Sequence, residues 1–154
     1  MNMPKKLSLA LYKPDIPQNT AAIIRLGACF NINVHIIEPC GFSLDDSRFK
    51  RVAMDYKKLC KILRYNDFKE FEKNNKNSRI ILMTTKAEKK YFKFKFNKSD
   101  IILFGRESAG VPNEIHKRFK NKLKIPINSN TRSLNVALSA AIVASEALRQ
   151  NNLF

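Results

Sequence analysis

The sequence predicts an α/β protein built on a doubly wound, mainly parallel sheet. Short apolar runs of strand length alternate with segments of helical periodicity, as in proteins whose helices cover both faces of a sheet. Neither an internal repeat nor a low-complexity linker interrupts this alternation. Three segments, 17–25, 103–112 and 125–135, each follow a strand-like run and open a helix-like one. Because α/β proteins bind ligands where strands end and helices begin, we expect these segments to share one pocket.

At 154 residues the chain suits a single domain, which we expect to span residues 1–154. No run approaches the ~20 apolar residues of a membrane-spanning helix, and the N-terminus lacks the apolar core of a secretory signal. The sequence therefore predicts a cytoplasmic protein without a membrane anchor.

The charge of the chain is strongly positive. The formal net charge is +16, from 29 Lys and Arg against 13 Asp and Glu. A surface of this kind carries a strong positive field, so we expect a polyanion as partner. A biased genome that inflates Lys and Asn is an alternative cause, but it does not explain the shortage of acidic residues.

Cysteine and histidine usage argues against a metal site. Cys29, Cys40 and Cys60 are an odd number without C-x-x-C spacing, which favours a reducing compartment. Cys29 lies in an apolar helical stretch, where we expect its thiol to be buried. His35 and His116 have no partner at metal-ligand spacing, and the apolar neighbours of His35 favour a strand position.

The first elements predict a β-α-β opening. Residues 7–12 are apolar and strand-like, and two prolines end the run before Asn19 and Thr20, a helix-capping pair. An apolar face at helical spacing predicts a helix over 20–30, and a second buried strand is expected over 34–37.

The middle of the chain continues the alternation less regularly. Charged residues and a Pro-Cys-Gly triplet predict a loop over 38–51, followed by a strand over 60–65. A short helix is expected over 67–73, capped from Asn66. The apolar run at 79–84 predicts a buried strand.

Residues 91–96 alternate aromatic side chains with lysines. This pattern predicts an exposed or edge strand whose lysines prevent unwanted strand pairing. It also suits stacking on nucleic-acid bases, or plain packing of the phenylalanines. The next run, 100–104, predicts a further core strand.

The C-terminal third predicts a helix over 113–118, a short strand over 123–125 and the longest helix over 134–150. The expected apolar face of this last helix comprises Leu134, Ala137, Leu138, Ala141, Ile142, Ser145 and Leu148. Small residues in the first and last helices let the two pack closely, meet another subunit, or simply cover the sheet.

Several catalytic motifs are absent from the sequence. Its four glycines form neither G-x-G-x-x-G nor G-x-x-x-x-G-K-[ST], which disfavours a Rossmann dinucleotide site and a P-loop. G-x-S-x-G and H-E-x-x-H are also missing, so the commonest hydrolase classes are disfavoured.

Two loops have the composition of ligand-binding turns. The loop at 105–112 contains two glycines that permit close approach or positive φ, and a proline suited to the first turn of a helix. The segment at 125–135 adds apolar, hydroxyl and amide groups. Each loop alone is also compatible with an ordinary strand-to-helix turn.

Taken together in chain order, these segments resemble the SPOUT superfamily of RNA methyltransferases. Its members share an N-x-x-x-I-x-R helix start, a G-x-E-x-x-G-[LV]-P loop and a late I-P…S-L-N segment, which match here at 19–25, 105–112 and 125–135. The resemblance is closest to the small tRNA 2′-O-methyltransferases that act on the wobble nucleotide. It implies a doubly wound domain with a deep C-terminal trefoil knot, a homodimer, and S-adenosylmethionine bound by the knotted loops.

The resemblance also implies roles for individual residues. Cofactor contacts would come from Met83, Gly105, Ile125 and Ser133, with backbone groups holding the adenine. Arg25 would be the catalytic residue. Because arginine stays protonated, we expect Arg25 to grip phosphate and stabilise the developing alkoxide rather than act as a base. An ion pair on the helix surface is the alternative role for this residue.

Three further residues would bind or position the RNA in this resemblance, namely Asn19, Glu107 and Asn135. Helix capping competes with ligand binding at the two asparagines and also at Ser133, and a surface turn is the alternative at the glutamate. The chain departs from the family pattern at three positions. Ala21 stands where relatives often have Gly, Arg106 where many have Pro, and Ser145 where some have Tyr.

These expectations converge on an S-adenosylmethionine-dependent tRNA 2′-O-methyltransferase that modifies the wobble cytidine or uridine. The alternatives are another site in tRNA or rRNA, and a basic RNA-binding α/β protein without catalysis. The sequence does not identify the tRNA species, the nucleotide or any accessory protein.

Overall fold

The computed structural model describes residues 5–154, apart from the side chains at positions 52, 54 and 57. The expected domain begins at residue 1, so its first four residues lie outside the described part of the chain. Within that part, six strands form one sheet in the order β3-β2-β1-β5-β4-β6, and every neighbouring pair is parallel. The strands are β1 (Ser8–Tyr12), β2 (Asn33–Ile37), β3 (Ile62–Tyr65), β4 (Ile80–Met83), β5 (Ile101–Phe104) and β6 (Lys122–Leu123).

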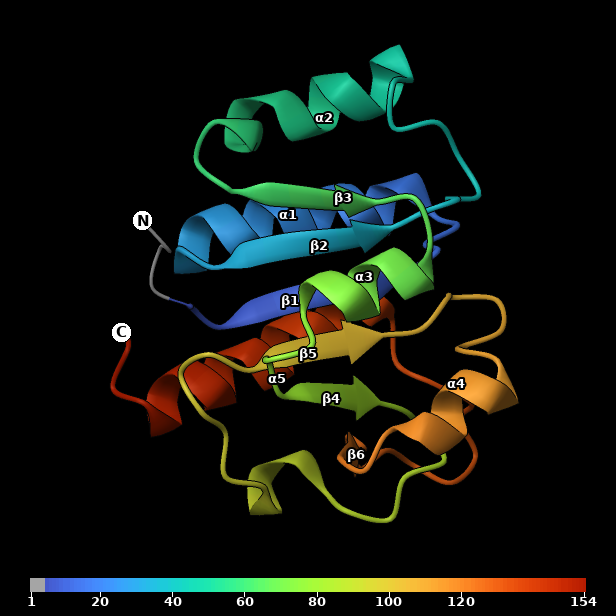
Figure 1. The fold of residues 1–154 in the computed structure, drawn as a ribbon, viewed down its shortest axis with the longest axis vertical. Coiled ribbons are helices and arrows are strands. Elements are labelled where there is room, and N and C mark those ends of the chain that lie inside the picture. Colours follow the sequence, from blue (N-terminus) through green and yellow to red (C-terminus); the bar gives the residue numbers. More distant parts are fainter. Residues whose placement is uncertain (1–4) are drawn as a thin grey trace.

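Helices cover both faces of this sheet, as Figure 1 shows. They are α1 (Pro17–Phe30), α2 (Ser47–Lys57), α3 (Phe68–Asn74), α4 (Asn113–Arg118) and α5 (Val136–Gln150), with a short 3₁₀ helix, η1 (Tyr91–Lys93). One buried cluster joins α1, α2 and α5 to the sheet, and a second joins α3 and α4 to its opposite face. The predicted doubly wound α/β class with a mainly parallel sheet is therefore confirmed.

Strand β1 lies at the centre of the molecule and is buried along its whole length. Leu9 and Leu11 belong to one cluster, whereas Ala10 and Tyr12 belong to the other. Successive side chains of a strand point to opposite faces, so a strand with a helix layer on each side must be apolar throughout. The apolar run from Leu9 to Tyr12 has this cause, and the buried Ser8 before it donates its hydroxyl to the Lys6 carbonyl at 3.0 Å.

The strand order reverses between β1 and β5, because β2 and β3 lie on one side of this pair and β4 and β6 lie on the other. The strand arrows in Figure 1 point the same way, so their carboxyl ends form one edge of the sheet. Doubly wound sheets bind ligands along this edge, near the point of reversal.

Helix α1 begins earlier than its sequence signal suggests. Its first residue is Pro17, and Ile16 at the N-cap makes no side-chain capping bond, so the predicted cap at Asn19 and Thr20 is wrong. Proline suits the first helical turn because its φ is preset and its missing N–H needs no partner there. The helix ends at Asn31, which adopts the left-handed conformation with φ 53°. Because the helix starts at Pro17, the Asn19 side chain does not cap it and is free for other contacts.

Part of the predicted 38–51 loop is helical, since α2 starts at Ser47. The Asp46 side chain accepts a hydrogen bond from the Arg48 backbone N–H at 2.8 Å, which caps the helix. Phe49 and Ala53 bury one side of it at i,i+4 spacing. The helix was not predicted because these apolar residues are few and many of the others in the helix are charged.

Helix α3 is capped by Asp67 rather than by the predicted Asn66. The Asp67 carboxylate accepts a hydrogen bond from the Glu70 backbone N–H at 2.7 Å, and the Glu70 carboxylate accepts from the Asn66 N–H at 2.6 Å. This pair resembles a capping box, except that aspartate is the cap and the Glu70 side chain binds the N–H of the residue before the cap.

The predicted edge strand at 91–96 is wrong, because this segment contains η1 followed by an irregular stretch. Phe94 and Phe96 are buried and pack edge to face with ring centroids 5.0 Å apart. Gln150 of α5 accepts a hydrogen bond from the Phe96 N–H at 2.9 Å and donates to the Phe94 carbonyl at 3.0 Å. The aromatic pattern therefore reflects packing of these phenylalanines, which leaves their rings unavailable for stacking on bases.

The apolar face predicted for α5 differs from the face that is buried. The buried residues are Ala140, Val143, Ala144, Ala147 and Leu148. Of the predicted face, Leu148 is buried, whereas Leu138 is 57% exposed and Ile142 is 36% exposed. The helix has two apolar sides. The side with the small residues packs closely against the sheet and against the neighbouring helix α1.

Cys29 is exposed, contrary to expectation, because α1 buries the side that carries Ile23, Ile24 and Gly27. Cys60 is the buried cysteine, and its thiol lies against the carbonyl of Ile32.

Candidate functional site

A cavity of about 660 Å³ opens at the carboxyl edge of the sheet. It lies among the ends of β4, β5 and β6 and the starts of α1 and α5. Its walls are formed by residues 82–86, 104–111, 124–125 and 132–136, together with Ile16, Asn19, His116, Ile127 and Ser139. A volume of roughly 300–1,000 Å³ is typical of sites for small molecules and cofactors.

The structure brings most of the predicted site residues to this cavity. Its lining includes Met83, Gly105, Ile125, Ser133, Asn19, Glu107 and Asn135. These residues come from segments far apart in the sequence, so the expectation of one shared pocket is confirmed. The assigned roles remain predictions.

Arg25 lies outside the lining of the cavity. It is exposed on α1, and its guanidinium carbon lies 4.9 Å from the centre of the Tyr56 ring on α2. No ion pair among the described residues includes Arg25, so the alternative of a surface ion pair has no support here. The guanidinium stacks on an aromatic face instead.

Two glycines determine the shape of the loop after β5. Arg106 and Gly110 exchange backbone hydrogen bonds of 3.1 and 2.8 Å, so the loop folds back on itself. A Cβ atom on Gly105 would lie 2.6 Å from the Gly110 backbone, and Gly110 has φ +66°, a conformation that other residues rarely adopt. The fold of this loop brings its main chain to the cavity wall.

Three polar side chains connect the starts of α1 and α5 to this loop. Asn135 donates a hydrogen bond to the Asn19 side-chain oxygen at 3.0 Å, and Asn19 donates to Glu107 at 3.4 Å. Asn135 also caps α5 by accepting from the Ala137 N–H at 2.8 Å. The predicted capping role is thus confirmed for Asn135, which also takes part in the polar network of the cavity.

Glu107, which lines the cavity, lies next to Asp15, which does not. Burial raises the pKa of Glu107, and the adjacent Asp15 side chain raises it further. The pKa of Asp15 is lowered, chiefly by its hydrogen bond with Glu107 and also by Ser108 and Arg106. Of the two carboxyl groups, Glu107 therefore takes up a proton at a higher pH than Asp15 does.

Positive charge surrounds the cavity. Lys86, Arg106, Lys124 and Arg132 contribute to its lining. His116 also lines it, with Nε2 3.3 Å from the Thr84 hydroxyl, and burial followed by nearby lysines lowers its pKa. This rim favours an anionic ligand such as a phosphodiester backbone.

Sequence reasoning missed the contribution of Asp15 and of Ser108. The Pro-Asp-Ile-Pro run before α1 was visible, but the contacts of Asp15 are with residues more than 90 positions away. No local pattern reports such contacts.

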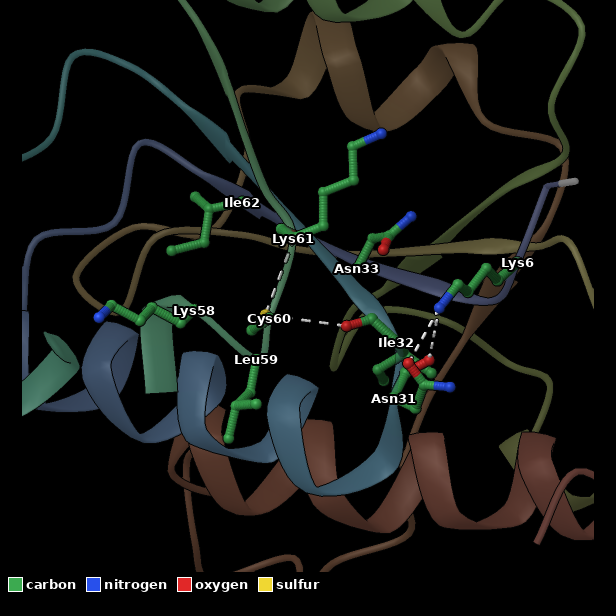
Figure 2. A pocket seen from close by; sticks show the side chains of 9 residues that line it. All are labelled: Lys6, Asn31, Ile32, Asn33, Lys58, Leu59, Cys60, Lys61 and Ile62. Carbon is green, nitrogen blue, oxygen red and sulfur yellow. Dashed lines mark hydrogen bonds between the residues drawn. The ribbon is translucent and has the colours of Figure 1, made fainter. Parts of the chain in front are cut away.

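A second cavity, of about 460 Å³, lies at the opposite edge of the sheet, beside the amino ends of β2 and β3. Lys58 and Lys61 point away from each other in Figure 2, and Lys6 donates to the Asn31 side chain at 3.0 Å. The charged groups do not converge on a common point. This cavity is therefore a poorer candidate for a specific site.

The described residues contain no group of three or more His, Cys, Asp or Glu side chains arranged to hold a metal ion. In the same part of the chain, no helix is both long and apolar enough to cross a membrane.

Comparison with known proteins gives this geometry a context. The model of the SpoU rRNA Methylase family matches residues 6–145. A tRNA (cytidine(34)-2′-O)-methyltransferase of Ancylobacter novellus is 43% identical over 150 residues, covering 96% of this chain and 95% of the relative. The enzyme of the same name from Escherichia coli K12 is 35% identical over 146 residues, covering 94% and 93%.

Solved structures agree with the sequence comparisons. One, from work on 2-OH methylation of C/U34 on tRNA, superposes with a TM-score of 0.91 at 34% identity and covers 97% of this chain and 99% of its own. An AdoMet-bound rRNA methyltransferase of Sinorhizobium meliloti shares the fold, with a TM-score of 0.85 at 20% identity over 96% of this chain and 57% of its own. The predicted resemblance to RNA methyltransferases is confirmed, and the chain belongs to the SpoU methylase family.

Proposed function

We propose that the protein is an S-adenosylmethionine-dependent tRNA methyltransferase that modifies the ribose 2′-hydroxyl of the wobble cytidine or uridine. The observation that carries this proposal is the single cavity formed by three motifs distant in the sequence. Relatives that are aligned over nearly their full length carry the name tRNA (cytidine(34)-2′-O)-methyltransferase, which supports the choice of substrate.

The residues of the cavity fit S-adenosylmethionine. Met83, Phe104 and Ile125 supply apolar surface for a planar base, and the close packing at Gly105 lets the main chain approach a ligand. Gly105, Met83, Ile125 and Ser133 would hold the cofactor. When bound, the cofactor supplies a methyl group on a sulfonium, which a nucleophilic oxygen can attack.

The remaining chemistry requires alignment of the ribose and removal of its hydroxyl proton. Arg25 would grip an adjacent phosphate and stabilise the developing negative charge on the ribose oxygen. Its place outside the cavity lining is consistent with a role toward the RNA rather than toward the cofactor. Asn19, Glu107 and Asn135 would position the RNA from the polar network at the cavity.

The proposal includes a homodimer and a deep C-terminal trefoil knot. Leu138 and Ile142 leave an exposed apolar side on α5, next to α1, which suits contact with a second copy. The loops after β5 and β6 line the same cavity, as a knotted C-terminal segment would require. We further propose one domain over residues 1–154, a cytoplasmic location, and tRNA bound through the positive surface without a metal ion.

Transfer of labelled methyl groups from S-adenosylmethionine to unmodified tRNA tests the function. The proposal predicts a 2′-O-methyl group at nucleotide 34, located by nuclease digestion and mass spectrometry, and its loss from tRNA of cells that lack the protein. Label in rRNA or at another tRNA nucleotide would contradict the choice of substrate. Failure to bind S-adenosylmethionine in calorimetry would contradict the enzyme assignment and favour an RNA-binding protein without catalysis.

A further inference from the structure

Asp15, in the segment between β1 and α1, contacts three consecutive residues of the loop after β5. The Ser108 hydroxyl donates a hydrogen bond to its Oδ2 atom. Arg106 Nη2 lies 3.4 Å from the same oxygen. The Asp15 backbone N–H donates to Glu107 Oε2 at 2.9 Å. A single residue thus joins two segments that are more than 90 positions apart in the sequence.

The position of Asp15 is itself closely constrained. Its side chain is 17% exposed, and the Gly41 N–H donates to the Pro14 carbonyl at 2.9 Å. A Cβ atom on Gly41 would lie 2.6 Å from the Asp15 Cβ, so the segment after β2 packs directly against it. This packing restricts the position of Asp15 and makes it a fixed point of attachment for the loop.

The loop after β5, which Asp15 contacts, forms one wall of the cavity. Arg106, Glu107 and Ser108 all line the cavity, and the Gly110 turn at its end has φ +66°. Among the described residues, Asp15 is the ion-pair partner of the Arg106 guanidinium, while Arg106 Nε and Asp15 Oδ1 are both buried without a hydrogen-bond partner. A loop that is ordered before binding loses less conformational entropy when it takes up a ligand.

We propose that Asp15 is a positioning residue that holds the loop at 105–110 in the shape that receives the cofactor. This inference rests on the proposed function. Asp15 does not line the cavity, so it acts through Arg106, Glu107 and Ser108. It therefore affects cofactor affinity, whereas the methyl-transfer step at saturating cofactor is left largely intact.

Calorimetry with S-adenosylmethionine, together with steady-state kinetics on tRNA, tests the role. Hydrogen bonds to charged groups are strong enough that we expect Asp15→Ala to weaken cofactor binding about tenfold or more. In this variant kcat at saturating cofactor and saturating tRNA stays within about twofold, a range expected for residues outside the reacting groups. KM for tRNA rises by less than the loss of cofactor affinity, because Glu107, which would position the RNA, is one of the contacts of Asp15. Asp15→Asn keeps an oxygen for Ser108 but loses the charge that pairs with Arg106. The cofactor affinity of this variant should therefore lie between those of the wild type and Asp15→Ala.

The matched control is Asp67→Ala, which removes an aspartate cap from α3 and should lower the melting temperature without changing cofactor affinity. Wild-type affinity in Asp15→Ala or, if that variant does not fold, in Asp15→Asn would overturn the inference. Loss of kcat without loss of affinity would overturn it as well. If the wild-type protein does not bind S-adenosylmethionine, the proposed function itself fails, which is a separate result.

Discussion

His35 on β2 illustrates how one buried side chain makes stability depend on pH. Its Nδ1 atom lies 2.8 Å from the Tyr65 hydroxyl, and its ring stacks on Tyr65 and meets the edge of Phe71. Burial, followed by the charge of Lys61, lowers the pKa of His35 from 6.5 to about 4. The unfolded chain therefore takes up a proton at a higher pH than the folded chain does.

The free energy of unfolding should consequently fall as pH drops from about 6.5 to about 4, by on the order of 3 kcal/mol. His35→Gln removes the histidine that titrates, so the free energy of unfolding of this variant, measured with urea, should change less with pH across the same range. Tyr65→Phe keeps the ring buried without the hydrogen bond and should retain the acid dependence. Parallel pH profiles for wild type and His35→Gln would contradict this explanation.

Arg25 is the residue on which the proposed chemistry most depends. Arg25→Ala should leave S-adenosylmethionine affinity near normal, because the residue lies outside the cavity, and should lower kcat about 100-fold, as loss of a charge-stabilising donor does. Arg25→Lys should restore little activity, since an ammonium cannot grip phosphate with two parallel bonds. Unchanged turnover in Arg25→Ala would contradict the catalytic role.

At the same scale, sequence reasoning found residues through motifs and missed those defined by contacts. The resemblance located Gly105, Ile125 and Ser133, which line the cavity together. It assigned no role to Asp15, whose partners are set by tertiary structure. The local residue pattern predicted that Asn19 caps a helix, but Pro17 starts that helix and the Asn19 side chain takes part in the site instead.

At the scale of elements, strands with continuous apolar runs were predicted within about one or two residues. The failures have one physical cause, which is that burial depends on neighbours outside the local window. Helix α2 was not predicted because many of its residues are charged. The 91–96 segment packs against α5 and does not form a strand at the edge of the sheet. In α5, the side with the small apolar residues is buried, and the side with the larger ones is exposed.

The loop after β5 can be tested as an element through Gly105→Ala. The added Cβ would meet the Gly110 backbone at 2.6 Å, so the loop must shift. We expect S-adenosylmethionine affinity to fall at least about tenfold, since ligand contacts depend on placement at the ångström scale. Gly27→Ala is the control, because its added Cβ would meet the Cys60 Sγ at 2.7 Å among residues that do not line this cavity, so it should leave the cofactor affinity unchanged. Equal affinity in Gly105→Ala and wild type would show that the loop does not hold the cofactor.

At the scale of the whole molecule, the alternation of strands and helices predicted the doubly wound class and the shared carboxyl edge. The strand order β3-β2-β1-β5-β4-β6 was not predictable, because pairing between distant strands leaves no trace in local periodicity. The proposed knot is a similar case, since it comes from the family resemblance and from no pattern in the chain.

The proposed dimer makes a prediction at this scale. Leu138 is 57% exposed and Ile142 is 36% exposed on the same side of α5, so burying them would stabilise an association of two copies. Leu138→Glu should shift the sedimentation coefficient from dimer to monomer, while Lys69→Glu, an exposed charge change on α3 at the opposite face of the sheet, should not. A wild-type protein that sediments as a monomer at micromolar concentration would contradict the dimer.

The central claim is that three distant segments together hold S-adenosylmethionine at the carboxyl edge of the sheet. Amide NMR shifts recorded during titration with the cofactor test it most directly. We predict that the signals of Gly105, Ile125 and Ser133 move together, with one common affinity, while those of Ile32 and Cys60 at the second cavity stay in place. Shifts confined to the second cavity, or no shifts at all, would contradict the account.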